Sequence, residues 1–279
     1  MKNIVVIPNE TKDTELLVTK RLVSLLYKEA FVFMQRAYEG RVDGVQFLDD
    51  AALFDDADCV IVLGGDGTIL RVSEPCGKKN IPVLGINLGR VGFMTEINPD
   101  ELEVAVKALL KGDYKIEKRM MMDIAVIKDE KISGEYLSLN DVVVAKDNAS
   151  MVLIKLYSDN EKINQYKADG LIISSPTGST GYSLSAGGPV ADPATEMFIA
   201  SPICAHELSA RPVVLSGERE LFLKLDKELG HNAVVSVDGE EREKIALGDK
   251  VIIKKSEFYM SIIKIGKQSF YDVLCEKLC

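Results

Sequence analysis

The feature that most constrains the fold is a run of five consecutive apolar residues, 59–63, that ends in a glycine-rich loop, Gly-Gly-Asp-Gly-Thr at 64–68. Strands that face water on one side alternate apolar and polar residues, so an unbroken apolar run predicts a strand buried on both faces. Such runs alternate with helical spacing along residues 3–7, 11–29, 59–63, 81–86 and 101–110. This alternation predicts an α/β domain with a parallel sheet covered by helices.

The pattern changes after about residue 114, where short runs rich in Val and Ile are separated by polar turns. Few helical stretches intervene, which predicts a mostly antiparallel β domain. We therefore expect an α/β domain over residues 1–117 and a β-rich domain over 118–261, with helical spacing returning at 268–278. The expected strands of the second domain are 122–127, 137–144, 152–157, 221–225, 233–237 and 251–254.

The charge balance limits the class of partner. A formal net charge of −9 repels nucleic acid and anionic membrane surfaces, so we expect neither as a partner. The same field repels nucleotides, so a nucleotide site would need local donors such as backbone amides, helix N-termini, a few cations or Mg²⁺. The apolar run at 3–7 is too short for a signal peptide, and no segment is long enough to span a bilayer. We expect a soluble, cytoplasmic protein.

The cysteines predict a reducing compartment and no zinc site. Their number, five, is odd, no CxxC pair occurs, and most lie in apolar stretches. Cys204 and His206 lie close together, but the only other histidine is His231 and no second ligand pair has useful spacing.

The glycine-rich loop predicts a phosphate site. In an open parallel sheet ligands bind at the carboxyl ends of strands, where Gly64, Gly65 and Gly67 would let amides approach a phosphate. Asp66 adds negative charge there, which is costly unless it holds a metal or meets the proton of an attacking hydroxyl. The alternative is a plain strand-to-helix turn with Asp66 as its N-cap. No Walker loop or GxGxxG follows an expected strand, which disfavours P-loop and Rossmann proteins.

Two further polar segments predict nucleotide binding. In residues 169–183 an apolar strand leads into a dense cluster of hydroxyls and glycines suited to phosphate and ribose, and Tyr182 can stack on a purine. Asn140 and Asp141 interrupt an apolar stretch; the amide can recognise an adenine edge and the carboxylate can accept both ribose hydroxyls. An ordinary polar loop and a β-turn, respectively, remain the alternatives.

These motifs occur in the order found in ATP–NAD kinases, together with residues 85–93, 187–189, 201–212 and 237–239. The chain resembles that family from about residue 58 to its end. Diacylglycerol and sphingosine kinases share the glycine loop, whereas the hydroxyl-rich segment and the Asn-acid pair single out NAD kinases. Residues 269–274 resemble the family's C-terminal helix, which implies that 262–279 join the N-terminal domain.

The resemblance implies transfer of a phosphoryl group from ATP to the 2′-hydroxyl of the adenosine ribose of NAD. Asp66 would meet that hydroxyl, while Gly67 and Thr68 would lie by the phosphates. Mg²⁺ would bind through the ATP phosphates, with no metal ligand set in the protein. Among the few cations near the motifs, Arg71 and Arg90 are candidates to assist, and the alternative is that both are solvated surface charges. Such kinases are usually homo-oligomers, here a homodimer or homotetramer.

The resemblance also implies a set of NAD-binding residues. Asn140 and Asp141 would bind the adenosine portion, and Asp169 would lie near the nicotinamide-riboside side. Thr177, Thr180 and Tyr182 would line the adenine pocket, and Asn87 and Phe93 belong to a stretch by the NAD site. Three positions depart from the family and bear on ligand preference: Gly181 for alanine, Asp141 for glutamate and Glu240 for glutamine.

Two other functions remain as alternatives. A lipid kinase with the same glycine loop would lack the Asn-acid pair and would carry a basic or apolar membrane-facing surface, which this composition disfavours. A non-catalytic NAD sensor would gain nothing from the Asp66 carboxylate beside phosphates.

Overall fold

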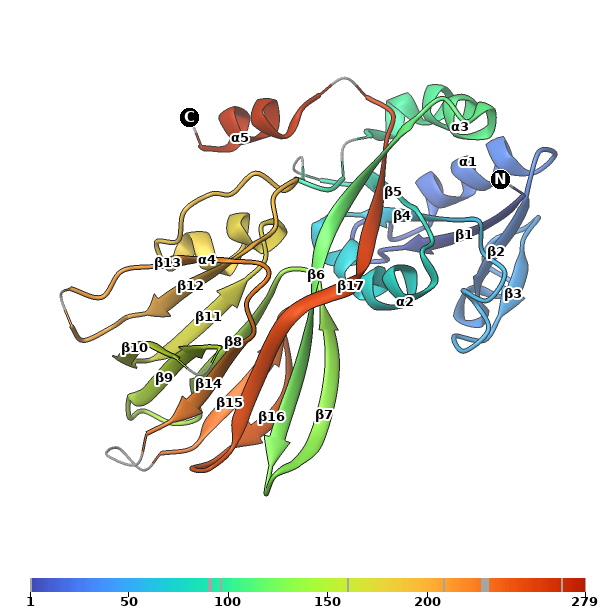
Figure 1. The fold of residues 1–279 in the computed structure, drawn as a ribbon. Coiled ribbons are helices and arrows are strands. Elements are labelled where there is room, and N and C mark those ends of the chain that lie inside the picture. Colours follow the sequence, from blue (N-terminus) through green and yellow to red (C-terminus); the bar gives the residue numbers. More distant parts are fainter. Residues whose placement is uncertain are drawn as a thin grey trace. The chain divides into compact units, whose positions relative to one another are not determined.

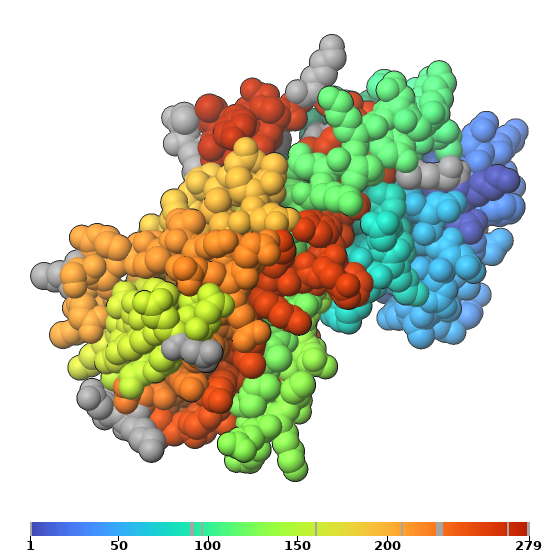
Figure 2. Space-filling model, viewed as in Figure 1, coloured from blue at the N-terminus to red at the C-terminus, as the bar shows by residue number. Residues whose placement is uncertain are grey.

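The structure, a computed structural model, describes residues 2–89, 92–95, 97–159, 161–207, 209–226, 231–266 and 268–278. The candidate Arg90 lies outside the described residues. The chain divides into two compact units, one of Met1–Lys118 with Met260–Cys279 and the other of Arg119–Tyr259. Figure 1 labels the elements and Figure 2 shows their side chains in the same view.

The first unit contains a parallel sheet in the order β17-β5-β4-β1-β2-β3 (Figure 1). This confirms the predicted parallel sheet. The sequence analysis missed β2, whose apolar run of four residues follows the first expected helix directly, and β3, a three-residue edge strand. The strands are β1 (Asn3–Pro8), β2 (Phe31–Gln35), β3 (Gln46–Leu48), β4 (Cys59–Gly64), β5 (Val83–Asn87) and the end of β17 (Lys250–Lys264).

Helices cover this sheet because alternate strand residues face opposite sides. Ile4 and Ile61 share a core with residues of α1 (Leu17–Leu26) and α3 (Leu102–Lys111). On the other side α2 (Asp66–Lys79) packs on β4 and β5, and the Ile69 side chain lies 3.1 Å from where a Cβ on Gly85 would be. The unit also includes α5 (Phe270–Leu278) and the 3₁₀ turns η1 (Arg36–Tyr38) and η2 (Pro99–Glu101).

Helix α1 is shorter than the predicted 11–29. The residues before it form turns, with Leu16 in the left-handed region at φ 55°. The Asp13 carboxylate then accepts hydrogen bonds from the backbone N–H of Val18 at 3.2 Å and of Thr19 at 2.9 Å. These bonds satisfy amides that an N-cap would otherwise satisfy, which fixes the start of the helix.

The second unit is built from antiparallel sheets, as predicted. One sheet has the order β13-β12-β11-β8-β15-β16, and the other includes β10-β9-β14-β17 and the hairpin β6-β7. Their apolar faces share one core, to which Val144, Ile154, Leu223 and Val235 belong. The strands are β6 (Lys115–Lys128), β7 (Lys131–Ser138), β8 (Asp141–Lys146), β9 (Val152–Ser158), β10 (Glu161–Ala168), β11 (Gly170–Ser174), β12 (Met197–Ile203), β13 (Val213–Ser216), β14 (Leu221–Leu225), β15 (Ala233–Val237), β16 (Glu240–Ile245) and β17.

The strands expected at 152–157, 221–225 and 233–237 are confirmed as β9, β14 and β15. The single strand expected at 137–144 is wrong, because the chain turns at 139–140 between β7 and β8, as the β-turn alternative requires. Strands β10, β12, β13 and β16 were not predicted; β10 and β16 are largely polar.

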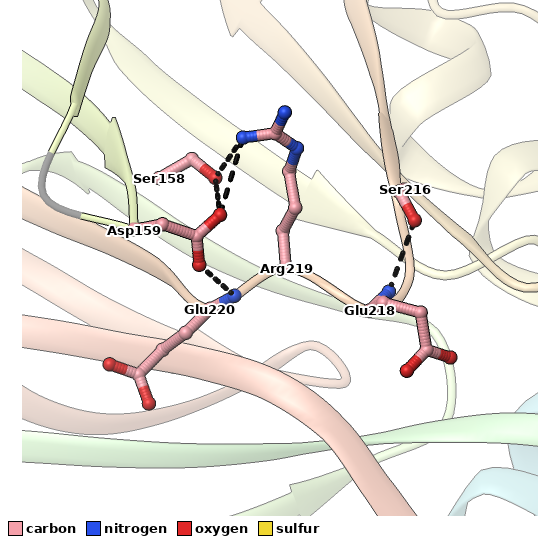
Figure 3. Close-up of polar contacts among 6 residues, drawn as sticks. All are labelled: Ser158, Asp159, Ser216, Glu218, Arg219 and Glu220. Carbon is pink, nitrogen blue, oxygen red and sulfur yellow. Dashed lines mark hydrogen bonds and ion pairs between the residues drawn. The ribbon is translucent and has the colours of Figure 1, made fainter.

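A polar cluster fastens the connection before β14 to the end of β9 (Figure 3). The Arg219 guanidinium donates to Ser158 Oγ at 3.0 Å and to the Asp159 carboxylate at 3.2 Å. The other Asp159 oxygen accepts from the backbone N–H of Glu220 at 3.3 Å. These bonds hold the register at which the two strands begin to pair.

In the part of the chain that the structure describes, no helix is long and apolar enough to cross a bilayer.

Candidate active site

The carboxyl ends of three neighbouring strands meet at one edge of the parallel sheet. Pro8 of β1 is paired with Leu63 of β4, and Gly64 is paired with Asn87 of β5. Two further backbone bonds join the loops that follow: Asn9 N–H donates to the Leu63 carbonyl at 2.8 Å, and Leu88 N–H donates to the Gly64 carbonyl at 2.7 Å. The glycine loop therefore lies between the loops after β1 and β5.

The glycines of this loop serve different purposes. A Cβ on Gly64 would lie 2.2 Å from Thr68 Oγ1, so packing excludes any side chain there. Gly67 is exposed, and nothing lies within 4 Å of its Cβ position. The first amides of α2, at Asp66 and Gly67, have no partner within the helix and are placed for an anion. The loop thus combines a closely packed start with an open, donor-rich end.

The Asp66 carboxylate is held by the segment that follows β5. Its Oδ2 accepts from the backbone N–H of Phe93 at 2.8 Å, while Oδ1 accepts from the N–H of Met94 at 3.1 Å and from the N–H and Oγ1 of Thr95 at 3.3 and 3.4 Å. The N-cap alternative is wrong, because Gly65 is the cap and Asp66 is the first residue of α2. Sequence reasoning did not anticipate that Asp66 fixes residues 93–95.

Gly92 makes this arrangement possible. A Cβ at that position would lie 2.1 Å from Asp66 Oδ1 and 2.4 Å from Thr95 Oγ1. The chain can therefore close over the carboxylate only with glycine at this position.

Asn87 and Phe93 lie in the same unit as Asp66. Asn87, 2% exposed, donates from Nδ2 to the Gly89 carbonyl at 3.1 Å, and its Oδ1 is buried with no partner among the described residues. The Phe93 ring instead contacts α5, with its centroid 5.6 Å from that of Phe270 and 4.5 Å from Lys277 Nζ. The structure thus brings Asn87 to the loop edge and places the Phe93 ring against the C-terminal helix.

The cations near the loop differ from those expected. Arg71 is exposed on α2, and no hydrogen bond or ion pair joins it to the glycine loop within the described ranges. Two residues that sequence reasoning missed lie closer. Asn9 Nδ2 donates to Thr68 Oγ1 at 3.1 Å, and Lys12 Nζ lies 3.0 Å from the Cβ position of Gly65. Neither belongs to a recognisable motif, so only the folded loop brings them there.

In the second unit the Asn140 turn wraps around the half-buried Asp238 carboxylate. Asp238 accepts from Ser138 Oγ at 2.7 Å and from the backbone N–H of Leu139, Asn140 and Asp141 at 2.8, 2.8 and 3.1 Å. Asp238 itself has φ 49°, a conformation that aspartate tolerates better than most residues. The sequence indicated Asp238 only as part of a motif, whereas the structure shows that its carboxylate accepts the hydrogen bonds that fix this turn.

The pKa of Asp141 is raised far above its ordinary value. It is 6% exposed, and burial, followed by the charge of Asp238, raises its pKa to about 7. Burial also raises the pKa of Asp238, against the lowering effect of its hydrogen bonds to the turn. Because Asp238 has four donors, it is the member of the pair that keeps its charge, and Asp141 is the member that takes up a proton near neutrality.

The hydroxyl-rich segment packs directly on this turn. The Asn140 carbonyl accepts from Ser175 N–H at 2.9 Å, and a Cβ on Gly178 would lie 2.1 Å from that carbonyl oxygen. The segment forms η3 (Thr177–Thr180) and α4 (Tyr182–Ser185), in which Tyr182 is 48% exposed. Sequence positions far apart thus form one compact cluster.

This cluster holds buried oxygens that lack partners. Asn140 Oδ1, Ser174 Oγ and Thr177 Oγ1 are buried without a hydrogen bond among the described residues. Such groups normally pair, because burying an unpaired polar atom costs free energy, so the cluster is a candidate place for a ligand. Thr180 Oγ1 donates to the Thr177 carbonyl at 3.3 Å, and a Cβ on Gly181 would lie 3.8 Å from Asn140 Nδ2.

Asp169 is not part of this cluster. In the antiparallel pair of β8 and β11, Ser174 is opposite Asp141 whereas Gly170 is opposite Ala145, so Asp169 lies at the other end of the pair. Its carboxylate forms an ion pair with Lys146 at 2.7 Å. Glu240, exposed, pairs with Arg242 at 2.9 Å.

Comparison with known proteins identifies the family. The family model of the ATP-NAD kinase N-terminal domain matches residues 9–114, and that of the C-terminal domain matches residues 139–265. The chain belongs to the ATP-NAD kinase family. The likeness therefore begins well before residue 58, where the sequence motifs placed it.

Relatives in this family span the whole chain. The NAD kinase of Caldanaerobacter subterraneus subsp. tengcongensis is 39% identical, over 100% of this chain and 99% of its own length. The NAD kinase of Acetivibrio thermocellus is 37% identical, over 100% and 97%. This chain is accordingly an ATP-dependent kinase of NAD, and the lipid kinase and sensor alternatives are set aside.

Solved structures of an NADH kinase and of an NAD kinase share the fold. The yeast NADH kinase complexed with NADH has a TM-score of 0.89 at 22% identity, covering 100% of this chain and 87% of that one. An NAD kinase from Archaeoglobus fulgidus in complex with ATP has a TM-score of 0.76 at 29% identity, covering 98% and 99%.

Proposed function

We propose that Asp66 orients the 2′-hydroxyl of the adenosine ribose of NAD for attack on the γ-phosphorus of ATP. The 2′-oxygen forms the new bond to phosphorus, the bond to the bridging oxygen breaks, and ADP leaves. The hydroxyl proton passes to the Asp66 carboxylate. Phosphoryl transfer depends mainly on positioning and charge stabilisation, so a rigidly held carboxylate suits this role.

The observation that carries this proposal is the set of hydrogen bonds from the backbone of residues 93–95 to the Asp66 carboxylate. Backbone donors fix the carboxylate at the carboxyl edge of the sheet, beside the open amides of α2. A carboxylate oxygen has about two lone pairs, and Oδ2 has one donor, from Phe93, so it can accept a further hydrogen bond. Gly64, Gly65, Gly67 and Thr68 would contact the phosphates, with Arg71 as an outlying cation.

The adenosine portion of NAD is assigned to the Asn140 cluster. The unpaired oxygens of Asn140 and Thr177 support this assignment, because an adenine amino group and ribose hydroxyls supply the donors they lack. Asp141 would accept from the ribose hydroxyls, Thr180 and Gly181 would line the pocket, and Tyr182 would stack on the base. Asn87, whose Oδ1 has no partner among the described residues, and Phe93 are also proposed to contact NAD, and Asp169 would lie toward the nicotinamide riboside.

Mg²⁺ is assigned to the ATP phosphates. No group of three His, Cys, Asp or Glu side chains that could hold a metal ion occurs among the described residues, and the Asp66 carboxylate already has backbone partners. Mg²⁺ typically keeps several waters and binds through substrate phosphates with few protein carboxylates, so the residues present fit this arrangement. When bound, it neutralises charge on the transferring phosphoryl group.

The enzyme is further proposed to act in the cytoplasm as a homodimer or homotetramer. The odd cysteine number supports the compartment, and the family resemblance supports the oligomer. Size-exclusion chromatography with light scattering would measure the oligomeric state.

The decisive experiment compares NADP formation by the native enzyme and Asp66→Asn, with Asp113→Asn as the matched control at an exposed position. We expect the rate to fall roughly 10²-fold or more in Asp66→Asn with NAD binding retained, and to stay unchanged in the control. A melting temperature near the native one would show that the 93–95 segment keeps its place.

Retention of the native rate by Asp66→Asn would refute the role of Asp66. Absence of NADP from the native enzyme, with either ATP or polyphosphate as donor, would refute the reaction itself.

A further inference from the structure

The loop after β1 carries a lysine over the glycine loop. Lys12 Nζ lies 3.0 Å from the Cβ position of Gly65 and 3.2 Å from that of Gly89. These glycines follow β4 and β5, so the ammonium group spans two of the three loops at the carboxyl edge of the sheet. With any side chain at Gly65 or Gly89, the ammonium group would have to move.

The backbone around Lys12 is fixed relative to that edge. Asn9 is the anchor: its N–H donates to the Leu63 carbonyl at 2.8 Å and its Nδ2 to Thr68 Oγ1 at 3.1 Å. Lys12 N–H donates in turn to the Asn9 carbonyl at 3.0 Å. Because Asp13 then caps α1 through Val18 and Thr19, the lysine sits in a short turn that is tied down on both sides.

The ammonium group has no partner of its own. Lys12 is exposed, and its Nζ makes no hydrogen bond or ion pair within the described ranges. The neighbouring acids are engaged elsewhere: Glu10 pairs with Arg41 at 3.0 Å, and Asp66 accepts from residues 93–95. In a chain of net charge −9, a cation held at a glycine-rich strand end without an acid beside it is available to an anion.

We propose that Lys12 binds the terminal phosphates of ATP. The inference rests on the proposed assignment of the phosphates to the Gly64–Thr68 loop and adds to it the positive charge that the sequence did not locate. The amides of α2 supply directional donors, while the lysine supplies a mobile point charge that can follow the phosphates during transfer. We assign Lys12 to ATP rather than to the NAD pyrophosphate because its Nζ lies at Gly65, in the loop to which the ATP phosphates are assigned.

The test measures equilibrium binding of ATP, ADP, AMP and NAD by calorimetry, for the native enzyme, Lys12→Met and Lys12→Arg. Lys107→Met, which removes an exposed lysine on α3, controls for the change in net charge. We expect Lys12→Met to weaken ATP and ADP binding about tenfold or more, as loss of a charged contact does, and to leave NAD binding unchanged. Lys12→Arg should recover part of the loss, and Lys107→Met should bind like the native enzyme.

Unchanged ATP binding by a folded Lys12→Met variant would overturn the proposal, as would a loss confined to NAD. An equal loss for AMP would also overturn it, because the contact would then be with the α-phosphate or nucleoside. These outcomes are distinct from failure of the proposed function, which would appear as a native enzyme without NADP formation or as an Asp66→Asn variant of native rate.

Discussion

Two aspartates in this kinase anchor backbone segments. Asp66 and Asp238 lie in different units, and each accepts hydrogen bonds from three or more successive residues of a loop. A carboxylate is suited to this because it accepts several hydrogen bonds at once and strengthens them by its charge. Only the residue type is visible in the sequence, so the sequence alone does not show that these acids anchor backbone segments.

The Asp141–Asp238 pair predicts a pH dependence of stability. The pKa of Asp141 is raised to about 7, above its ordinary value of 3.8, so its contribution to stability is fully present below pH 4 and is lost as pH rises through 7. Asp141→Asn removes the charge that is buried above that pH. We expect this variant to exceed the native enzyme in free energy of unfolding by on the order of 2 kcal/mol at pH 8, with little difference at pH 4.

Urea unfolding at pH 4, 6 and 8 measures this difference, with Asp113→Asn as the exposed control. If the difference in free energy of unfolding between the native enzyme and Asp141→Asn stays the same from pH 4 to pH 8, the raised pKa is contradicted.

At the scale of elements, loops at strand ends are set by backbone packing that excludes side chains. Gly92→Ala places a methyl group against Asp66 Oδ1 and Thr95 Oγ1, so the segment must move off the carboxylate. We expect a loss of stability of about 1–3 kcal/mol and a large fall in the rate of NADP formation. Gly67→Ala meets nothing within 4 Å and lies in the first turn of α2, so its melting temperature should equal or slightly exceed the native one.

The packing of η3 on the Asn140 turn gives a second prediction at this scale. Gly178→Ala would put a methyl group 2.1 Å from the Asn140 carbonyl oxygen, whereas Gly181→Ala would put one 3.3 Å from the Gly178 carbonyl oxygen. We expect Gly178→Ala to weaken NAD binding roughly tenfold or more, and Gly181→Ala to bind NAD within about twofold of the native enzyme. Calorimetric titration with NAD measures both; equal affinities would show that the turn is not part of the NAD site.

For the whole molecule, the sequence pattern predicted the features that follow from local periodicity, namely the two kinds of sheet. Continuous apolar runs at β1, β4 and β5 gave the parallel sheet, and the change in texture after residue 114 gave the second, antiparallel part. It missed β10 and β16, whose polar residues form strands only because neighbouring strands pair with them. The sequence analysis missed the position of Lys12 at Gly65 and the hydrogen bond from Asn140 to Asp238 for the same reason. Both are contacts between segments that are distant in the sequence.

The strand order of the first unit also determines when its sheet can be completed during translation. Strand β5 pairs with β4 on one side and, at Val83, with Ile262 of β17 on the other. On the ribosome, residues 83–87 emerge long before their second neighbour has been translated. Until then the nascent sheet has an open edge, the kind of surface that other chains can join. The N-terminal part of the chain is made first, but its sheet is completed only after residue 262 has been made.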